Sequence, residues 1–147
     1  MALDELYREV ILDHYRNPRN RQPLAEPDAE AEGVNPLCGD EVTVQLSFHG
    51  DRIDQVSVKG HGCSISQSSG SMMGEAIKGL TRPELAELAG KFHSMLTAEN
   101  GEVPLDDERP GLYLGDLEAL QGVRRYPVRI KCAALPWTTL EQALNED

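Results

Sequence analysis

The sequence predicts an α+β fold in which a small antiparallel sheet is covered by helices. Apolar and polar residues alternate over residues 42–48, which is the period of a strand with one buried face. Several other stretches repeat apolar residues every three or four positions, which is the period of an amphipathic helix. The chain of 147 residues is long enough to bury one core, and it contains no internal repeat or low-complexity segment. We therefore expect residues 1–147 to form a single domain.

The first predicted element is a helix that ends at Asn17. One face of it is marked by residues that recur at three- and four-residue spacing, namely Leu3, Leu6, Tyr7, Val10, Ile11 and His14. Pro18 ends the helix, because the residue before a proline avoids helical geometry. Residues 18–33 are rich in Pro, Asn, Ala and Glu without any period, so we expect them to form a loop.

Two strands are predicted next, and they form an antiparallel hairpin. The first has apolar residues at every second position, namely Val42, Val44, Leu46 and Phe48. The turn residues His49-Gly50-Asp51 separate it from a second strand that carries Ile53, Val56 and Val58. This second strand ends at Gly60-His61-Gly62, where the glycines allow a sharp change of direction.

Two helices are predicted to follow the hairpin. Residues 63–80 form the first, and its many serines allow another element to approach closely, so we expect it to be buried. Thr81 and Glu84 have the spacing of a capping box, which opens a second helix through about Leu96. Residues 99–111 are acidic and marked by prolines, and we interpret them as a loop.

The C-terminal part is predicted to be helical. Residues 117–123 indicate a short helix, and the last helix runs from about Val128 to the C-terminus. Pro136 falls inside that last helix and cannot donate a hydrogen bond to the carbonyl of Cys132. We therefore expect a kink or a helix restart there.

Charge and hydropathy exclude several classes of function. The net charge of −11 argues against a nucleic-acid partner, whose phosphates need a basic surface. No window approaches 18 apolar residues, so no membrane span is predicted. The acidic N-terminus lacks the features of a signal peptide, and three cysteines make a disulfide framework improbable. We expect a cytoplasmic protein with free thiols.

Three cysteines and one aspartate could form a tetrahedral zinc site. Cys38, Asp40, Cys63 and Cys132 each lie at a glycine turn or at the start of a helix, where free N–H groups stabilise thiolates. Three thiols and a carboxylate supply the four ligands that zinc requires. Spacing alone also fits scattered buried cysteines, and His61 is an alternative ligand. Asp40 would be a hard ligand among soft ones, which suggests a site that can open.

A basic segment precedes the last cysteine. Arg124, Arg125, Arg129 and Lys131 lie within eight positions. They could form an ordinary solvated face. Beside a thiolate site, however, they would lower the pKa of the thiols.

The chain resembles the IscU/NifU-like iron–sulfur assembly proteins. The resemblance lies in the N-terminal run 7–20 and in three cysteine motifs: Asn35-Pro36-Leu37-Cys38-Gly39-Asp40, Gly60-His61-Gly62-Cys63-Ser64-Ile65-Ser66 and Lys131-Cys132-Ala133. Residues 81–115 look longer than in the IscU scaffolds, residues 114–123 look like a SufU signature, and Lys131 stands where the scaffold branch carries histidine. The chain is thus similar to the SufU branch, which implies an IscU/SufU-like fold and zinc on Cys38, Asp40, Cys63 and Cys132.

The resemblance also implies a function in sulfur transfer. The protein would accept persulfide sulfur from a SufS-type cysteine desulfurase for iron–sulfur cluster assembly, and other SUF proteins are further candidate partners. We expect Cys38 to be the acceptor because it lies on a loop, and Arg129 and Lys131 to favour the anionic sulfur species. One alternative is a scaffold on which a transient [2Fe-2S] cluster is assembled on the same residues. Another is a purely structural zinc domain that binds proteins.

Overall fold

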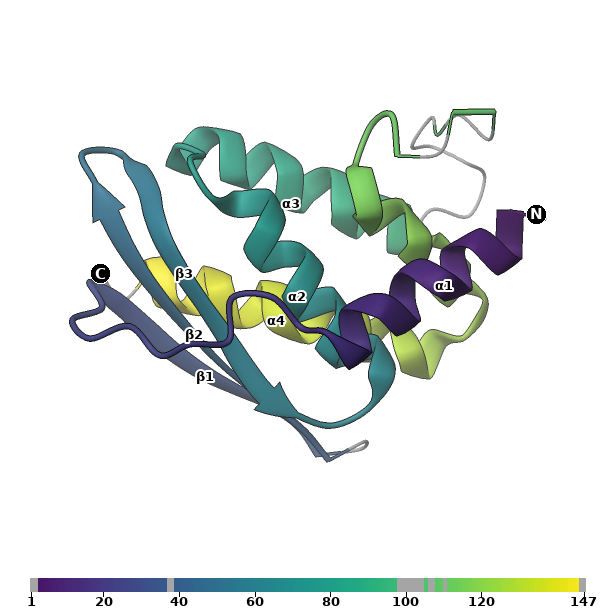
Figure 1. Cartoon of the computed structure of the whole chain (residues 1–147), viewed down its shortest axis with the longest axis horizontal. Helices are drawn as coiled ribbons and strands as arrows, with labels where there is room; N and C mark the ends of the chain where they lie inside the picture. Colours follow the sequence, from purple (N-terminus) through teal and green to yellow (C-terminus); the bar gives the residue numbers. More distant parts are fainter. Residues whose placement is uncertain (1–2, 37–38, 98–104, 106–107, 110, 146–147) are drawn as a thin grey trace.

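The computed structural model describes residues 3–36, 39–97, 105, 108–109 and 111–145. These residues form a three-stranded antiparallel sheet with helices packed on it (Figure 1). The predicted α+β fold is therefore confirmed. The elements in chain order are α1 (Leu3–Arg16), β1 (Ala29–Asn35), β2 (Asp40–His49), β3 (Arg52–His61), α2 (Ser64–Ile77), α3 (Arg82–Thr97), the 3-10 helix η1 (Gly115–Arg125) and α4 (Pro127–Asn145).

The sheet has the order β1-β2-β3, with Val44 of β2 opposite Ala31 of β1 and Val58 of β3. The hairpin of β2 and β3 was predicted, but the assignment of residues 18–33 to a loop is wrong for the part that forms β1. Ala29 and Ala31 are buried there, whereas Glu30 and Glu32 are exposed. Alanine and glutamate are poor strand formers, so only this alternation marks the strand in the sequence.

Small residues in β1 are required because α4 packs directly on it. A Cβ atom on Gly33 would lie 2.0 Å from Oγ1 of Thr139 in α4. The same close approach occurs between α2 and its neighbours, where Ser69 donates a hydrogen bond of 2.6 Å to the carbonyl of Ala133. Ser68, Ser69 and Ser71 are all buried. The prediction that the serine-rich helix is buried is therefore confirmed.

The helix ends follow local chemistry. The capping box is present, because the N–H of Glu84 donates to Oγ1 of Thr81 at 3.3 Å and the N–H of Thr81 donates to Oε1 of Glu84 at 3.1 Å. The helix α2 ends at Ile77, three residues before its predicted end. The helix α4 runs through Pro136 without interruption, so the expected restart is absent. Most of the predicted loop 99–111 lies outside the described residues.

The start of β2, the end of β3 and the start of α2 lie at the same end of the sheet. The helix α4 covers β1 and β2, and α2 covers β3. At the lower end of the sheet in Figure 1, β2 begins, β3 ends and α2 begins.

Among the described helices, none combines the length and the apolar character that a membrane crossing would need.

Candidate metal centre

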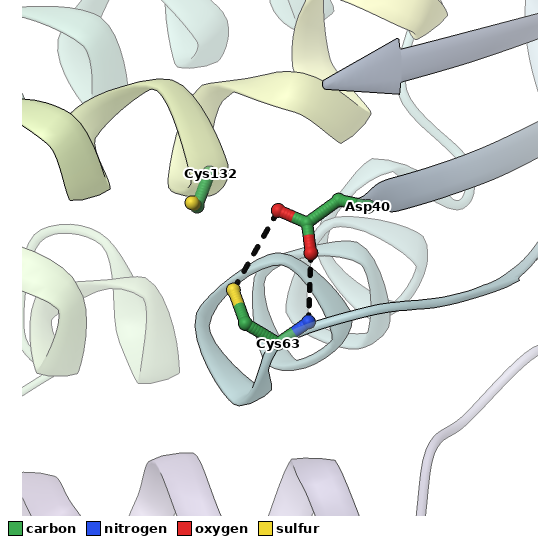
Figure 2. A group of neighbouring side chains, drawn as sticks. All are labelled: Asp40, Cys63 and Cys132. Atoms are coloured by element: carbon green, nitrogen blue, oxygen red, sulfur yellow. Dashed lines mark hydrogen bonds between the residues drawn. The ribbon is translucent and has the colours of Figure 1, made fainter. Parts of the chain in front are cut away.

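Asp40, Cys63 and Cys132 converge at this end of the sheet. One ligand atom from each lies within 4.8 Å of the others. Asp40 is the first residue of β2, Cys63 is the N-cap residue of α2, and Cys132 lies in α4 (Figure 2). The structure thus brings together three of the four predicted ligands. The fourth, Cys38, lies outside the described residues.

The carboxylate of Asp40 is fully buried and touches Cys63 twice. Its Oδ1 accepts the backbone N–H of Cys63 at 2.7 Å, and its Oδ2 lies 3.6 Å from the Cys63 Sγ. Gly62 makes this approach possible. Its φ is +142°, and a Cβ atom there would lie 2.1 Å from Oδ1 of Asp40. A side chain at position 62 would therefore displace the carboxylate.

Cys132 of α4 is fully buried, and its thiol faces Asn35 at the end of β1. Its Sγ lies 3.8 Å from Nδ2 of Asn35 and 3.9 Å from the carbonyl oxygen of Val128. The amide of Asn35 is a donor, so it suits a sulfur that carries negative charge. Sequence reasoning assigned no role to Asn35, although it opens the motif that contains Cys38 and Asp40.

The two predicted basic residues are placed differently. The charge of Cys63 and a hydrogen bond with Cys132 raise the pKa of Arg129, so this guanidinium lies beside both sulfurs. Arg129 precedes Cys132 by three residues and shares its helix face. Lys131 precedes Cys132 by one residue, which turns it about 100° around the helix. Lys131 is exposed.

His61 points to a different partner. Its Nε2 lies 2.8 Å from Oε2 of Glu41, and its side chain is 74% exposed. Within the described residues, His61 is not part of the group formed by Asp40, Cys63 and Cys132. The alternative that His61 is a ligand thus gains no support from the geometry.

The chemistry of the three donors fits a zinc ion. Two thiols and a carboxylate are ligand types that zinc binds in tetrahedral sites. A metal ion would also add positive charge beside the buried carboxylate and the two sulfurs, which is favourable because an uncompensated charge in the interior is costly. Asp40 and Cys132 are buried and Cys63 is half-buried, so a metal ion here would be shielded from bulk water on most sides.

Comparison with known proteins identifies the family. The family described as NifU-like N terminal domain matches residues 6–145. The chain belongs to the NifU-like N-terminal domain family. Its resemblance to the IscU/NifU-like proteins is therefore confirmed.

Full-length relatives of this NifU-like chain include both branches of the family. It is 40% identical over 145 residues to the zinc-dependent sulfurtransferase SufU of Bacillus subtilis, which spans 99% of this chain and 93% of the relative. It is 36% identical over 143 residues to the iron–sulfur cluster assembly scaffold protein IscU of Streptococcus pyogenes, which spans 97% and 85%. The crystal structure of the protein called FiSufU, from Fervidobacterium islandicum, superposes with a TM-score of 0.80 at 37% identity and covers 92% of this chain and 94% of FiSufU.

Proposed function

We propose that this protein is a zinc-dependent sulfur acceptor that takes persulfide sulfur from a cysteine desulfurase for iron–sulfur cluster assembly. The observation that carries the proposal is the convergence of Asp40, Cys63 and Cys132 at one end of the sheet. The 40% identity to the zinc-dependent sulfurtransferase SufU over nearly the full length supports it. We expect the protein to act in the cytoplasm with a SufS-type desulfurase.

Zinc would be held by Cys38, Asp40, Cys63 and Cys132. When bound, it would keep the thiols deprotonated at neutral pH and protect them from oxidation. Cys38 is only two residues from Asp40 in the sequence, so we expect the segment that leads into β2 to contribute both ligands. Asp40 is the hardest of the four ligands and the easiest to exchange.

The sulfur transfer is a thiol–persulfide exchange that needs no added oxidant. A thiolate of this protein attacks the outer sulfur of the persulfide on the desulfurase. A new S–S bond forms on this chain while the S–S bond of the donor breaks, and the donor cysteine leaves as a thiolate. Arg129 lies beside Cys63 and Cys132 and would attract the anionic persulfide.

Cys38 is the proposed acceptor. The thiol of Cys132 is fully buried, and Cys63 is fixed by the hydrogen bond from its N–H to Asp40. We expect Cys38 to lie in a turn, because in the sequence it falls between Asn35, the last residue of β1, and Asp40, the first residue of β2. A turn residue reaches a partner protein more easily than a helix residue does.

A desulfurase turnover assay tests the proposal. Alanine formation from cysteine should increase when the zinc-loaded protein is added to a SufS-type desulfurase, and Cys38→Ser should remove the increase. Dithiothreitol, which accepts the sulfur chemically, shows that the desulfurase itself is active. If dithiothreitol supports turnover and the wild-type protein does not, this chain is not the acceptor, and a purely structural zinc domain becomes the better explanation.

A scaffold for a [2Fe-2S] cluster is the second candidate function. The same thiols and carboxylate could bind such a cluster, and the identity of 36% to a protein named as an IscU scaffold favours this alternative. Anaerobic reconstitution with iron and sulfide separates the two functions. A stable visible absorption spectrum with a stoichiometric cluster supports the scaffold, whereas retention of zinc supports the sulfur acceptor.

A further inference from the structure

A groove runs from the side of α1 to the metal centre. Two pockets of about 510 Å³ and 630 Å³ lie along it. They share six lining residues, which shows that they are continuous: Ile11, Ser64, Ile65, Ala119, Gly122 and Arg125. One end of the groove is lined by Tyr7 and Leu12 of α1, and the other end by Cys63 and Arg129.

In the described part of the chain, every charged residue that lines this groove is an arginine. Arg8, Arg124 and Arg125 line the first pocket, and Arg125 and Arg129 line the second. Among the described residues, no aspartate or glutamate lines either pocket. The whole chain carries a net charge of −11, so the groove differs in sign from the rest of the molecule.

The groove is also partly apolar. Ile11 and Ile65 lie where the two pockets overlap, Val123 and Tyr126 line the second one, and Tyr126 is 63% exposed. Exposed aromatic residues beside arginines are typical of protein-binding surfaces. An occupant therefore needs carboxylates for the arginines and at least one apolar side chain for the isoleucines.

We propose that this groove binds an extended acidic segment of the protein that donates the sulfur. The inference rests on the proposed function and adds the chemistry of the docking segment. Four arginines spread along the groove match several carboxylates on one chain better than the single charge of a small molecule. An acidic segment would be repelled by the remaining, acidic surface, so the groove would also fix its position.

This arrangement would deliver the donor to the reacting groups. Cys63 lines the second pocket, and its Sγ lies 3.6 Å from Oδ2 of Asp40. A segment held in the groove thus places the donor protein directly against the metal centre. Binding energy from the groove would bring the persulfide within reach of the thiols.

Gly122 allows the groove to be blocked without damage to the fold. It lines both pockets, and a Cβ atom built on it meets nothing within 4 Å. Gly122→Trp should therefore fill the groove. Gly90, on the exposed side of α3, also has open space around its Cβ position, and Gly90→Trp is the matched control.

The experiment measures docking and transfer separately. A SufS-type desulfurase with its catalytic cysteine changed to serine is titrated with each zinc-loaded variant to obtain Kd. The active desulfurase gives kcat and the concentration of this protein at half-maximal stimulation. Gly122→Trp and Arg125→Glu should raise both Kd and the half-maximal concentration about ten-fold or more, with kcat largely unchanged. Gly90→Trp and Lys91→Glu, which alter α3, should behave as wild type.

A photo-crosslinking amino acid at position 122 identifies the occupant. The cross-linked peptide of the desulfurase should contain several aspartates or glutamates. Wild-type affinity in both groove variants, or cross-linking to a peptide without acidic residues, overturns the groove proposal while the wild-type protein still accepts sulfur. If the wild-type protein accepts no sulfur from an active desulfurase, the proposed function and the groove proposal fail together.

Discussion

The carboxylate of Asp40 contacts both the backbone N–H and the sulfur of Cys63. Its Oδ1 accepts the backbone N–H of Cys63 at 2.7 Å, while its Oδ2 lies 3.6 Å from the sulfur of the same residue. Asp40 therefore fixes the N-cap residue of α2, and we propose that its second oxygen is also a metal ligand. These two roles can be separated by mutation.

Asp40→Asn should weaken zinc binding and preserve the fold. The asparagine carbonyl can still accept the N–H of Cys63, but the anionic ligand is lost. Asp40→Ala removes both, and it leaves the N–H of Cys63 without this acceptor, which costs about 1–3 kcal/mol. Zinc affinity by competition with a chelator and urea unfolding of the zinc-free proteins distinguish the two effects. Wild-type zinc affinity in Asp40→Asn would contradict a ligand role.

The purified protein should contain about one zinc per chain, as a single four-ligand site requires. Removal of zinc should lower the melting temperature, because the ligands come from separate elements and metal binding free energy is also folding free energy. Elemental analysis and thermal unfolding before and after chelation measure both quantities. Absence of zinc together with an unchanged melting temperature would contradict the site.

Gly62→Ala should damage the metal centre. The new Cβ atom would lie 2.1 Å from Oδ1 of Asp40, and φ at this position is +142°. We expect a loss of about 1–3 kcal/mol in the free energy of unfolding and weaker zinc binding. Gly90→Ala in α3 is the control and should gain about 0.5–1 kcal/mol, because alanine is the better helix former. A Gly62→Ala protein with wild-type stability and zinc affinity would contradict the close contact.

His14 joins three elements through its two ring nitrogens. Its Nε2 lies 2.8 Å from Oδ2 of Asp116 in η1, and its Nδ1 lies 2.8 Å from Oγ of Ser71 in α2. Because an ionised carboxylate only accepts, Nε2 donates to Asp116, and in the tautomer with its proton on Nε2 the Nδ1 atom accepts from the hydroxyl of Ser71. His14 is only 2% exposed, so both bonds form in the interior or at its edge.

His14→Phe should reduce the free energy of unfolding by about 1–3 kcal/mol, because the buried hydroxyl of Ser71 loses a partner. Asp116→Asn keeps an acceptor for Nε2 on a side chain that is 61% exposed, so it should cost less. Urea unfolding of both variants tests whether His14→Phe reduces the free energy of unfolding more than Asp116→Asn does. Since α1 and η1 flank the groove, His14→Phe should also weaken docking, and an unaffected Kd would show that His14 does not support the groove.

The sequence predicts those elements whose residues carry a strong period. The hairpin and the helices are of this kind, and the capping box at Thr81 and Glu84 is formed as predicted. The strand β1 was missed because it lacks large apolar residues at its inward positions. Ala29 and Ala31 are buried there, and Gly33 leaves room for Thr139 of α4. This need for room comes from the tertiary structure and has no strong local signal.

The members of the site can be predicted from their chemistry, but their contacts cannot. Asp40, Cys63 and Cys132 converge as the ligand types suggested. The hydrogen bond from Cys63 to Asp40 and the steric role of Gly62 depend on the path of the backbone. Similarly, Arg129 and Lys131 look equivalent in sequence, yet the turn of α4 places only Arg129 on the face of Cys132. The groove combines Ile11, Ile65 and Gly122, so no local pattern reveals it.

Mass spectrometry of peptides can identify which cysteine accepts the sulfur. Desulfurase and cysteine should leave one additional sulfur atom on Cys38. The reason is accessibility, since Cys132 is 0% exposed and Cys63 begins a helix and is held by Asp40. Loss of transfer in Cys38→Ser would not suffice, because the same change removes a proposed zinc ligand. The decisive measurement is therefore mass spectrometry of peptides from the persulfidated, alkylated wild-type protein. If the additional sulfur is found repeatedly on Cys63 or Cys132 and never on Cys38, that other cysteine is the acceptor and Cys38 serves only as a zinc ligand.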